Sequence, residues 1–449
     1  MTFNGPKGES FARRRTKLVE TICRQKAVVF IPGAPEAIYS NDVHYRYRPA
    51  TNIRYLSGFE EPAALILSTV SQASPRFVLL VQPRDETSET WTGRRAGIEG
   101  AIATYGADDA YPLENWTTQL EVELKDAEHL YYGHSVDVRE NERLFEVVHR
   151  VNAARQRGGG QALELTEVGA VIDDMRQIKH ADEIELLRRA CAVSAAAHRR
   201  AMESLVPGMY EYHVEATIEH EFRAAGCAGP AYGTIAAAGA NATILHYTRN
   251  TSRLLDGQLL LVDAGAEYGG YCGDITRTLP IGASYTRAQA DLYELVLAAQ
   301  MIAIETVAPG TPQTSVHDAA VRTLTRGMLD LDILEGSEDE CIESGAYKKY
   351  FMHGTSHWLG MDVHDVGDYH VQKRPRLLEP GFVLTVEPGL YIPEGSACDP
   401  RWHGIGVRIE DDVLVTEVGH RVLTDAIPKS LEDLERILAA RPASREAAE

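Results

Sequence analysis

Hydrophobic and polar positions follow two different patterns along the chain. In the first third, short apolar runs alternate with turn residues and helix-like stretches, which is typical of an α/β domain. The predicted strands are 27–31, 64–67 and 77–81. The sequence RGGG at 157–160 interrupts the pattern, and a helix is predicted over 163–175. We therefore expect an α/β N-terminal domain over residues 1–172 and a second domain over 173–449.

The second region contains the same order of elements twice. The predicted helices are 182–205 and 211–225 in the first copy and 291–307 and 316–329 in the second. Asp182 and Glu185 have capping-box spacing at the start of the first helix, and Gly226 follows the second. Strand-like segments follow each helix pair. Two copies with so long a period predict an α+β domain built from two related halves, with a site shared between them.

Two aspartates in the first half are expected to lie close together. Asp263 directly follows the apolar run 259–262, and a carboxylate there must be protonated, paired or metal-bound. If the Gly-Gly pair at 269–270 forms a hairpin turn, Asp263 pairs with Thr276, and Asp274 projects from the same face. Like charges this close raise each other's pKa unless a cation lies between them, and this segment contains no lysine. The pattern indicates a metal site.

The second half repeats the arrangement with glutamates. Glu387 follows the run 382–386, and Arg408 lies two residues before Glu410, on the same face of a predicted strand. The segment 353–357 has H-x-x-x-H spacing but lacks the glutamate of a zincin helix. One imidazole and several carboxylates exceed what a single ion needs, so we expect a pair of divalent ions bridged by carboxylate oxygens and a water.

A simpler reading exists for each residue taken singly. An aspartate at a strand end is most often a turn former, and an isolated histidine is most often a surface or packing residue. The shared face, the apolar run, the mirrored glutamates and the histidine cluster together favour the metal site.

Composition narrows the choice of partners. The chain has 449 residues, of which 44% are hydrophobic, and its net charge of −20 disfavours nucleic acid and anionic membranes as partners. No apolar run reaches the roughly 18 residues of a membrane span. Six scattered cysteines and no evident secretory segment predict reduced thiols and a cytoplasmic location. Loops for phosphate binding and a G-x-S-x-G serine elbow are absent from the sequence.

Several segments resemble aminopeptidase P, the Xaa-Pro aminopeptidase family of bacteria. In the second domain these are ILHYTRN (244–250), LLLVDAGAEYGGYCGDITRTLP (259–280), FMHGTSHWLGMDVHDVG (351–367), LTVEPGLYI (384–392) and GVRIEDDVLVT (406–416). RYRPATNIRYLSGFEEPAALIL (46–67) and ETWTGRRAG (89–97) extend the resemblance to nearly the whole chain. Likeness to methionine aminopeptidase, prolidase and creatinase is fainter. The resemblance implies a pita-bread catalytic domain, and an N-terminal domain that serves substrate access and oligomerisation.

The resemblance also implies a role for each candidate site residue. The residues that match the metal ligands are Asp263, Asp274, His357, Glu387 and Glu410, of which Asp274 and Glu410 would bridge the ions. His246, His353 and His364 match the histidines around the reacting bond, and Arg408 matches an arginine that orients a carboxylate. The positions that fall in the substrate pocket are Asp42, Trp91, Tyr232 and Tyr391. Because no ligand departs from the family pattern, a metal-free creatinase-like hydrolase is disfavoured.

The expected activity is metal-dependent removal of the N-terminal residue from peptides with proline in second position, by a hydroxide that bridges two metal ions. Glu387 would accept the proton of the attacking water, and His364 would donate to the carbonyl oxygen. Manganese is the expected ion because carboxylate-rich sites favour hard metals, with cobalt, zinc or iron as substitutes. The alternatives are a prolidase-type Xaa-Pro dipeptidase and a non-enzymatic peptide-binding pita-bread protein. We expect a homo-oligomer, either a tetramer or a dimer.

Overall fold

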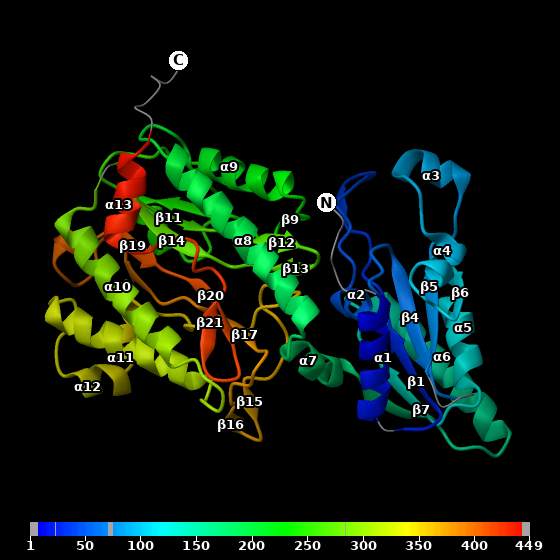
Figure 1. The fold of residues 1–449 in the computed structure, drawn as a ribbon. Coiled ribbons are helices and arrows are strands. Elements are labelled where there is room, and N and C mark those ends of the chain that lie inside the picture. Colours follow the sequence, from blue (N-terminus) through cyan, green and yellow to red (C-terminus); the bar gives the residue numbers. More distant parts are fainter. Residues whose placement is uncertain (1–7, 23, 71–74, 283, 442–449) are drawn as a thin grey trace. The chain divides into compact units, whose positions relative to one another are not determined.

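The computed structural model describes residues 8–22, 24–70, 75–282 and 284–441. The chain divides into two compact units, Met1–Met175 (unit 1) and Arg176–Glu449 (unit 2) (Figure 1). Among the helices of the described ranges, none is both long enough and apolar enough to cross a membrane.

Unit 1 is built on a six-stranded sheet in the order β6-β5-β4-β1-β7-β8. Its strands are β1 (Ala27–Ile31), β4 (Ala63–Ser68), β5 (Arg76–Val81), β6 (Asp109–Pro112), β7 (His129–Tyr132) and β8 (Glu164–Glu167), and a separate exposed hairpin joins β2 (Ile38–Ser40) to β3 (Val43–His44). The helices are α1 (Gly8–Ile22), α2 (Thr51–Ser57), α3 (Glu86–Thr92), α4 (Gly97–Ala103), η1 (Leu113–Asn115), α5 (Trp116–Leu124), α6 (Val138–Arg157) and α7 (Gly169–Gln177). The three strands predicted from apolar runs are confirmed as β1, β4 and β5.

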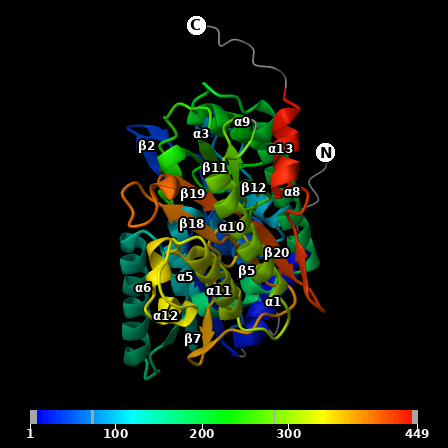
Figure 2. The ribbon, with the colours of Figure 1, turned by 90° about the vertical axis from the view of Figure 1, so that its left-hand side faces the viewer.

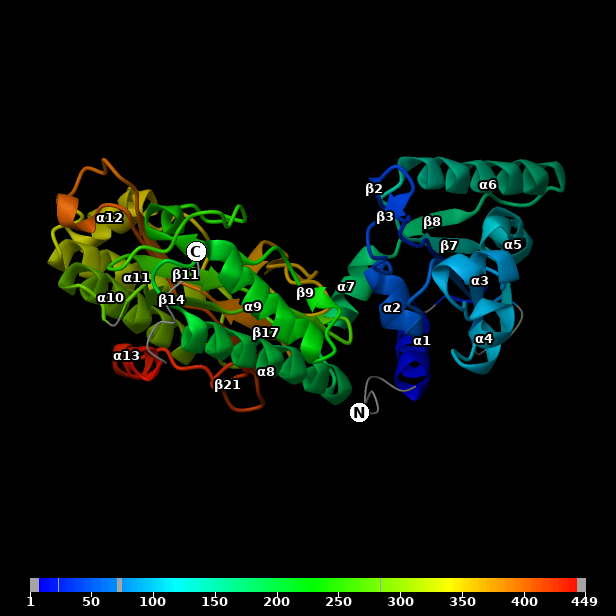
Figure 3. The ribbon, with the colours of Figure 1, turned by 90° about the horizontal axis from the view of Figure 1, so that it is seen from above.

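Alternation along the strands of unit 1 separates two packed faces. Val78 and Leu80 lie in one buried cluster with residues of α5 and α6. Figure 3 shows both of these helices in unit 1. Phe77, one position before Val78, receives the Arg15 guanidinium of α1 over its ring at 3.8 Å from the centroid. The sheet therefore lies between helices on both faces, which is the predicted α/β architecture.

The helix predicted over 163–175 is wrong in its first part. Residues 164–167 form β8, which extends the edge of the sheet by pairing in parallel with β7. Val168 continues this contact by donating its N–H to the carbonyl of Tyr132, and the helix begins at Gly169. Backbone pairing with β7 outweighs the helix propensity of this segment.

Two antiparallel helix pairs and two groups of strands form unit 2. The helices are α8 (Ala181–Ser204), α9 (Glu211–Ala224), α10 (Arg287–Glu305), α11 (Thr314–Asp330), α12 (Glu338–Glu343) and α13 (Leu431–Ala439), and short 3₁₀ helices are η2 (Gly239–Thr243), η3 (Ala346–Lys349) and η4 (Pro400–Trp402). Packing of α8 against α9 and of α10 against α11 confirms the predicted repeat of helix pairs (Figures 1 and 2).

The start of α8 differs from the prediction. His180 is the N-cap, and Glu183 completes the capping box by accepting the His180 N–H at 3.1 Å. The helix begins at Ala181, so the third helical position is Glu183 and not Glu185. Gly226 has φ +86° directly after the C-cap of α9, as predicted.

The strands of unit 2 repeat one motif. They are β9 (Gly229–Pro230), β10 (Ile235–Ala238), β11 (Leu259–Asp263), β12 (Ala266–Tyr268), β13 (Tyr271–Cys272), β14 (Thr276–Pro280), β15 (His370–Val371), β16 (Arg374–Pro375), β17 (Val383–Val386), β18 (Gly389–Ile392), β19 (Ile405–Arg408), β20 (Asp411–Val415) and β21 (His420–Val422). In the first half, β11 pairs with β14 and the hairpin β12–β13 lies between them in sequence. In the second half, β17 pairs with β20 and the pair β18–β19 lies between.

The predicted register of the first hairpin is confirmed. Tyr268 pairs with Tyr271 across the Gly-Gly turn, and Asp263 pairs with Thr276. Between these two ladders the strand pairing is interrupted, and we call this interruption the break. Because the register is the same on both sides, the residues next to the break are held at the end of a well-defined strand pair. The corresponding break in the second half lies beyond the pair Val386 and Asp411.

Candidate active site

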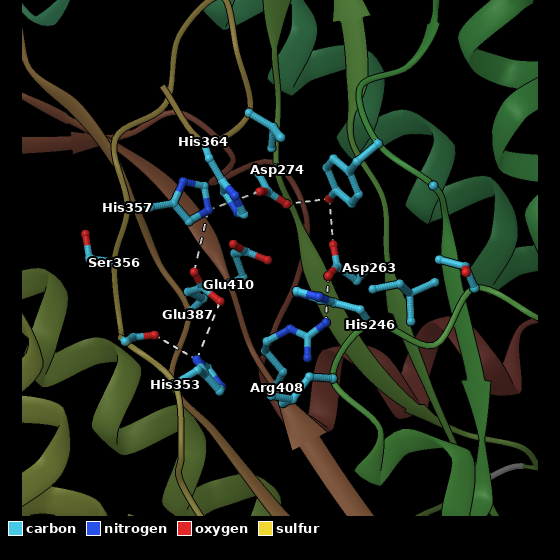
Figure 4. Close-up of a pocket in the computed structure, with 17 residues that line it drawn as sticks. His246, Asp263, Asp274, His353, Ser356, His357, His364, Glu387, Arg408 and Glu410 are labelled. Atoms are coloured by element: carbon cyan, nitrogen blue, oxygen red, sulfur yellow. Dashed lines mark hydrogen bonds and ion pairs between the residues drawn. The ribbon is translucent and has the colours of Figure 1, made fainter. Parts of the chain in front are cut away.

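Unit 2 contains a cavity of about 500 Å³ at the breaks in these two strand pairs (Figure 4). It is lined by residues from both halves, as the repeat predicted. Ten of the candidate residues line it: Tyr232, His246, Asp263, Asp274, His353, His357, His364, Glu387, Arg408 and Glu410.

The repeated strand motif brings the four acids to this cavity. Asp263 ends β11, and Asp274 lies two residues before β14. Glu387 directly follows β17, and Glu410 directly precedes β20. Each half therefore contributes one acid that leaves a buried strand and one that enters the partner strand.

Asp263 is held from two sides. Arg408 donates from Nη2 to Asp263 Oδ2 at 2.6 Å, and the Tyr232 hydroxyl lies 2.6 Å from Oδ1. The same hydroxyl is also within hydrogen-bonding distance of Asp274 Oδ1. A phenol has one proton and can satisfy only one of the two carboxylates at a time. The predicted substrate-pocket residue Tyr232 thus lines the cavity and also bridges two candidate metal ligands.

Thr276 connects Arg408 to Glu410. Its hydroxyl donates to Glu410 Oε2 at 2.6 Å and accepts from Arg408 Nε at 3.1 Å. Sequence reasoning did not identify Thr276 as a site residue, although its pairing with Asp263 was predicted, and that pairing was the available signal. The predicted proximity of Arg408 to Glu410 is therefore realised through a third side chain.

His357 is oriented by the backbone. Its Nδ1 lies 3.0 Å from the carbonyl of Trp358, so Nδ1 carries the proton and Nε2 faces the acids. Nε2 lies 3.5 Å from Asp274 Oδ2 and 3.6 Å from Glu387 Oε1. Burial alone would lower the pKa of His357, but Asp274 and Glu387 raise it to about 9. These carboxylates therefore favour the protonated, positively charged form of the His357 ring.

The same crowded, buried site also raises the pKa values of three of the acids, which favours their neutral forms. Burial, opposed by His357 and Arg408, raises the pKa of Glu387 to about 7. The pKa of Glu410 is raised well above its ordinary value by burial and by Asp274, and burial also raises the pKa of Asp263 against the attraction of Arg408. Without added cations, these carboxyl groups are driven towards their protonated forms.

The donor set fits divalent ions. Asp274, His357 and Glu410 each offer a ligand atom within 4.8 Å of the others, and Asp263 and Glu387 line the same cavity. Among the described lining residues, four carboxylates face one permanent cation, Arg408. The deficit of about three positive charges is more than a single dication supplies, and the oxygen-rich set suits hard metals.

The three other histidines surround this cluster. The pKa of His353 is lowered to about 4 by burial and by Arg408, so its ring is neutral. Its Nδ1 lies 2.7 Å from the carbonyl of Gly354 and must donate, which leaves Nε2 to accept from the Tyr391 hydroxyl at 2.8 Å. The His364 ring lies nearly perpendicular to that of His357, with centroids 4.3 Å apart. His246 reaches the cavity from the loop after η2.

Three candidate substrate residues do not line the cavity. Tyr391 is fully buried and connects Arg408 to His353, because Arg408 Nη1 donates to its hydroxyl at 3.0 Å. Its hydroxyl therefore supports these two side chains, and its contact with substrate remains a prediction. Asp42 and Trp91 belong to unit 1, where both are exposed, and their contact with substrate remains a prediction. The cavity also has apolar lining residues that sequence reasoning missed, namely Ile235, Leu245 and Val363.

Comparisons with known proteins agree with this site. The family model described as "Metallopeptidase family M24" matches residues 185–417, and the model described as "Aminopeptidase P, N-terminal domain" matches residues 11–131. The Xaa-Pro aminopeptidase of Escherichia coli (strain K12) is 41% identical over 96% of this chain and 98% of its own length.

Solved structures extend the agreement to the fold. The structure of Pseudomonas aeruginosa aminopeptidase PepP is 43% identical, covers 98% of this chain and 99% of its own, and has a TM-score of 0.94. Zinc-substituted aminopeptidase P of Escherichia coli in complex with product is 40% identical, covers 98% of this chain and 100% of its own, and also has a TM-score of 0.94. The chain therefore belongs to metallopeptidase family M24, as an aminopeptidase P with a pita-bread catalytic domain, and is a metal-dependent exopeptidase.

Proposed function

We propose that this exopeptidase removes the first residue from peptides whose second residue is proline, and that it uses two divalent ions. The observation that carries the proposal is the cavity whose described lining contains four carboxylates and four histidines but one arginine. The 41% identity to an Xaa-Pro aminopeptidase over 96% of the chain supports the substrate class.

In this proposal Asp263, Asp274, His357, Glu387 and Glu410 would hold the ions, and Asp274 and Glu410 would serve both of them. Manganese is the proposed ion because four of the five ligands are hard carboxylates. When bound, such ions supply Lewis acidity and lower the pKa of a coordinated water.

The chain's own residues transfer protons and stabilise charge at the scissile bond. Glu387 faces the cavity within 3.6 Å of His357 and accepts the proton of the attacking water. His364 donates to the carbonyl oxygen as negative charge develops, and His246 stabilises charge from the opposite loop. Proline nitrogen has no N–H, so it must be protonated as it leaves, and Glu387 is the group placed to return a proton.

The remaining assignments concern the role of unit 1, the oligomeric state and the cellular location. We propose that unit 1 serves substrate access and oligomerisation, that Asp42 and Trp91 contact the peptide, and that the enzyme is a homotetramer or dimer in the cytoplasm. The exposed hairpin β2–β3, which carries Asp42, and the 84% exposure of Trp91 are compatible with such contacts.

A comparison of two substrates and two variants tests the function. The manganese-supplemented enzyme should cleave Xaa-Pro-Xaa peptides faster than Xaa-Pro dipeptides, and a chelator should abolish both activities. Glu387→Gln should lower kcat by about 10²–10⁴-fold. Glu379→Gln, an exposed acid eight residues earlier, should leave kcat unchanged and serves as the matched control.

Three outcomes would contradict the proposal. Activity confined to Xaa-Pro dipeptides would indicate a prolidase-type enzyme. Binding of a peptide without any turnover in manganese would indicate a peptide-binding protein. Full activity after chelation would remove the role of the ions.

A further inference from the structure

A cluster of two cations and two carboxylates, of which only Asp362 is partly exposed, lies beside the loop that carries His364. Asp365 Oδ1 accepts from Arg176 Nη2 at 2.5 Å, and its Oδ2 accepts from Lys179 Nζ at 3.0 Å. Arg176 Nη2 also donates to Asp362 Oδ2 at 2.7 Å. The side chains of Arg176, Lys179 and Asp365 are only 3%, 2% and 1% exposed.

Such a cluster fixes its members in place. The buried Asp365 carboxylate is paired with two buried cations, and Arg176 is also paired with the partly exposed Asp362, so each of the three buried groups depends on its partners. Loss of one member leaves an uncompensated charge in a medium of low dielectric constant, and the local structure must rearrange. Arg176 lies in the last turn of α7 and Lys179 lies between α7 and α8, 189 and 186 residues before Asp365 in the sequence.

Two glycines show that the loop is shaped to fit this cluster. A Cβ added at Gly360 would lie 2.0 Å from Asp365 Oδ2 and 3.0 Å from Lys179 Cε. Gly367 has φ +121°, and a Cβ there would lie 2.2 Å from Gln177 Cδ. Gly360 therefore leaves room for the Asp365 carboxylate, and Gly367 lies closer to the Gln177 side chain than a residue with a Cβ could.

The cluster is connected to the cavity through one carbonyl. The N–H of Asp365 donates to the carbonyl of Trp358 at 2.9 Å, and this carbonyl also lies 3.0 Å from His357 Nδ1. His364, which directly precedes Asp365, places its ring 4.3 Å from that of His357 (Figure 4). The positions of the two rings are thus tied to the position of Asp365.

We propose that Arg176, Lys179 and Asp365 are positioning residues that hold His364 in place to donate to the substrate carbonyl. This inference rests on the role proposed above for His364. None of the three residues lines the cavity, so they act through the loop and not on the substrate. Supporting residues of this kind typically account for about 10–100-fold in activity.

A double-mutant cycle tests the inference. Asp365→Asn should lower kcat on an Xaa-Pro-Xaa peptide by about 10–100-fold, with KM changed less than about twofold. In a His364→Ala background, the same substitution should change kcat by less than about twofold, because the ring that it positions is already gone. The metal content of each chain, measured by plasma mass spectrometry, should be unchanged.

Two further variants separate positioning from general stability. Lys179→Met removes one of the two cations and leaves Asp365 paired with Arg176. If Asp365→Asn does not fold, the double-mutant cycle is repeated with Lys179→Met, which disturbs the cluster less. Glu123→Gln removes the partly buried ion pair with Arg76 in unit 1 and should leave kcat unchanged.

The possible results are distinct. If Asp365→Asn lowers kcat by the same factor in the wild-type and His364→Ala backgrounds, the positioning role is overturned while the proposed function stands. Loss of bound metal in Asp365→Asn would have the same meaning. Values of kcat within twofold of wild type for both Asp365→Asn and Lys179→Met would do the same. If His364→Ala itself retains full kcat, the proposed role of His364 is overturned, and this inference with it.

Discussion

Glu387 should make the metal-free protein less stable as the pH rises. Its pKa is about 7 in the folded protein, because burial outweighs the attraction of His357 and Arg408, and 4.5 is its ordinary value. Between pH 4.5 and 7 the unfolded chain therefore releases this proton while the folded protein retains it. Stability that is fully present below pH 4.5 is lost as the pH rises through 7.

The size of the effect follows from the two pKa values. Each pKa unit corresponds to about 1.4 kcal/mol, so the difference between 4.5 and about 7 amounts to about 3 kcal/mol. Between pH 5 and pH 7.5, about 2 to 3 kcal/mol of this should be observed. Divalent ions should remove the penalty, because they compensate the charge of the ionised carboxylate.

Urea unfolding of the chelated protein measures the effect. The free energy of unfolding is determined for wild type and Glu387→Gln at both pH values, followed by tryptophan fluorescence, since Trp358 and Trp402 are buried in unit 2. Relative to wild type, the variant should gain about 2 to 3 kcal/mol on going to the higher pH. His198, whose pKa is about 4, favours folding as the pH rises, but it is present in both proteins and Glu387 is not among the groups that shift its pKa, so its contribution cancels. A difference that stays constant, or that favours wild type at pH 7.5, would refute the reasoning.

Three further substitutions have defined outcomes. Asp274→Asn should reduce bound manganese to one ion per chain or fewer by plasma mass spectrometry, and an unchanged stoichiometry would exclude it as a ligand. Arg277→Met removes the 2.7 Å contact with Asp411, whose side chain is 1% exposed, and should lower the free energy of unfolding by about 3–5 kcal/mol; a loss below about 1 kcal/mol in urea unfolding would contradict this. Gly360→Ala should lower kcat at least about tenfold while the far-UV circular dichroism stays native, because its Cβ would meet Asp365. Wild-type kcat in this variant would show that the loop tolerates displacement.

Local patterns predicted the parts of the site that depend on short stretches of chain. The Gly-Gly turn at 269–270 was sufficient to predict that Asp263 pairs with Thr276, because a tight hairpin fixes its own register. The apolar run before Asp263 predicted a buried strand, and the repeated helix pairs predicted a site between two halves. These features are set by alternation and turns, which the sequence displays directly.

Contacts between distant segments could not be predicted in the same way. Lys179 and Asp365 are 186 residues apart, and neither lies in a pattern that indicates an ion pair. Tyr391 lies in a segment that resembles the family, but only the fold shows that its hydroxyl faces Arg408 and His353 from a buried position. The start of β8 was missed because the contact that stabilises it is made by β7.

The central claim is that the carboxylates of the two halves coexist because a pair of divalent ions lies between them. Anomalous diffraction from crystals grown with manganese tests it most directly. We expect two peaks in each chain, both bounded by Asp263, Asp274, His357, Glu387 and Glu410, with Asp274 and Glu410 next to both. A cavity with no peak, or a single peak with Asp274 and Glu410 pointing apart, would contradict it.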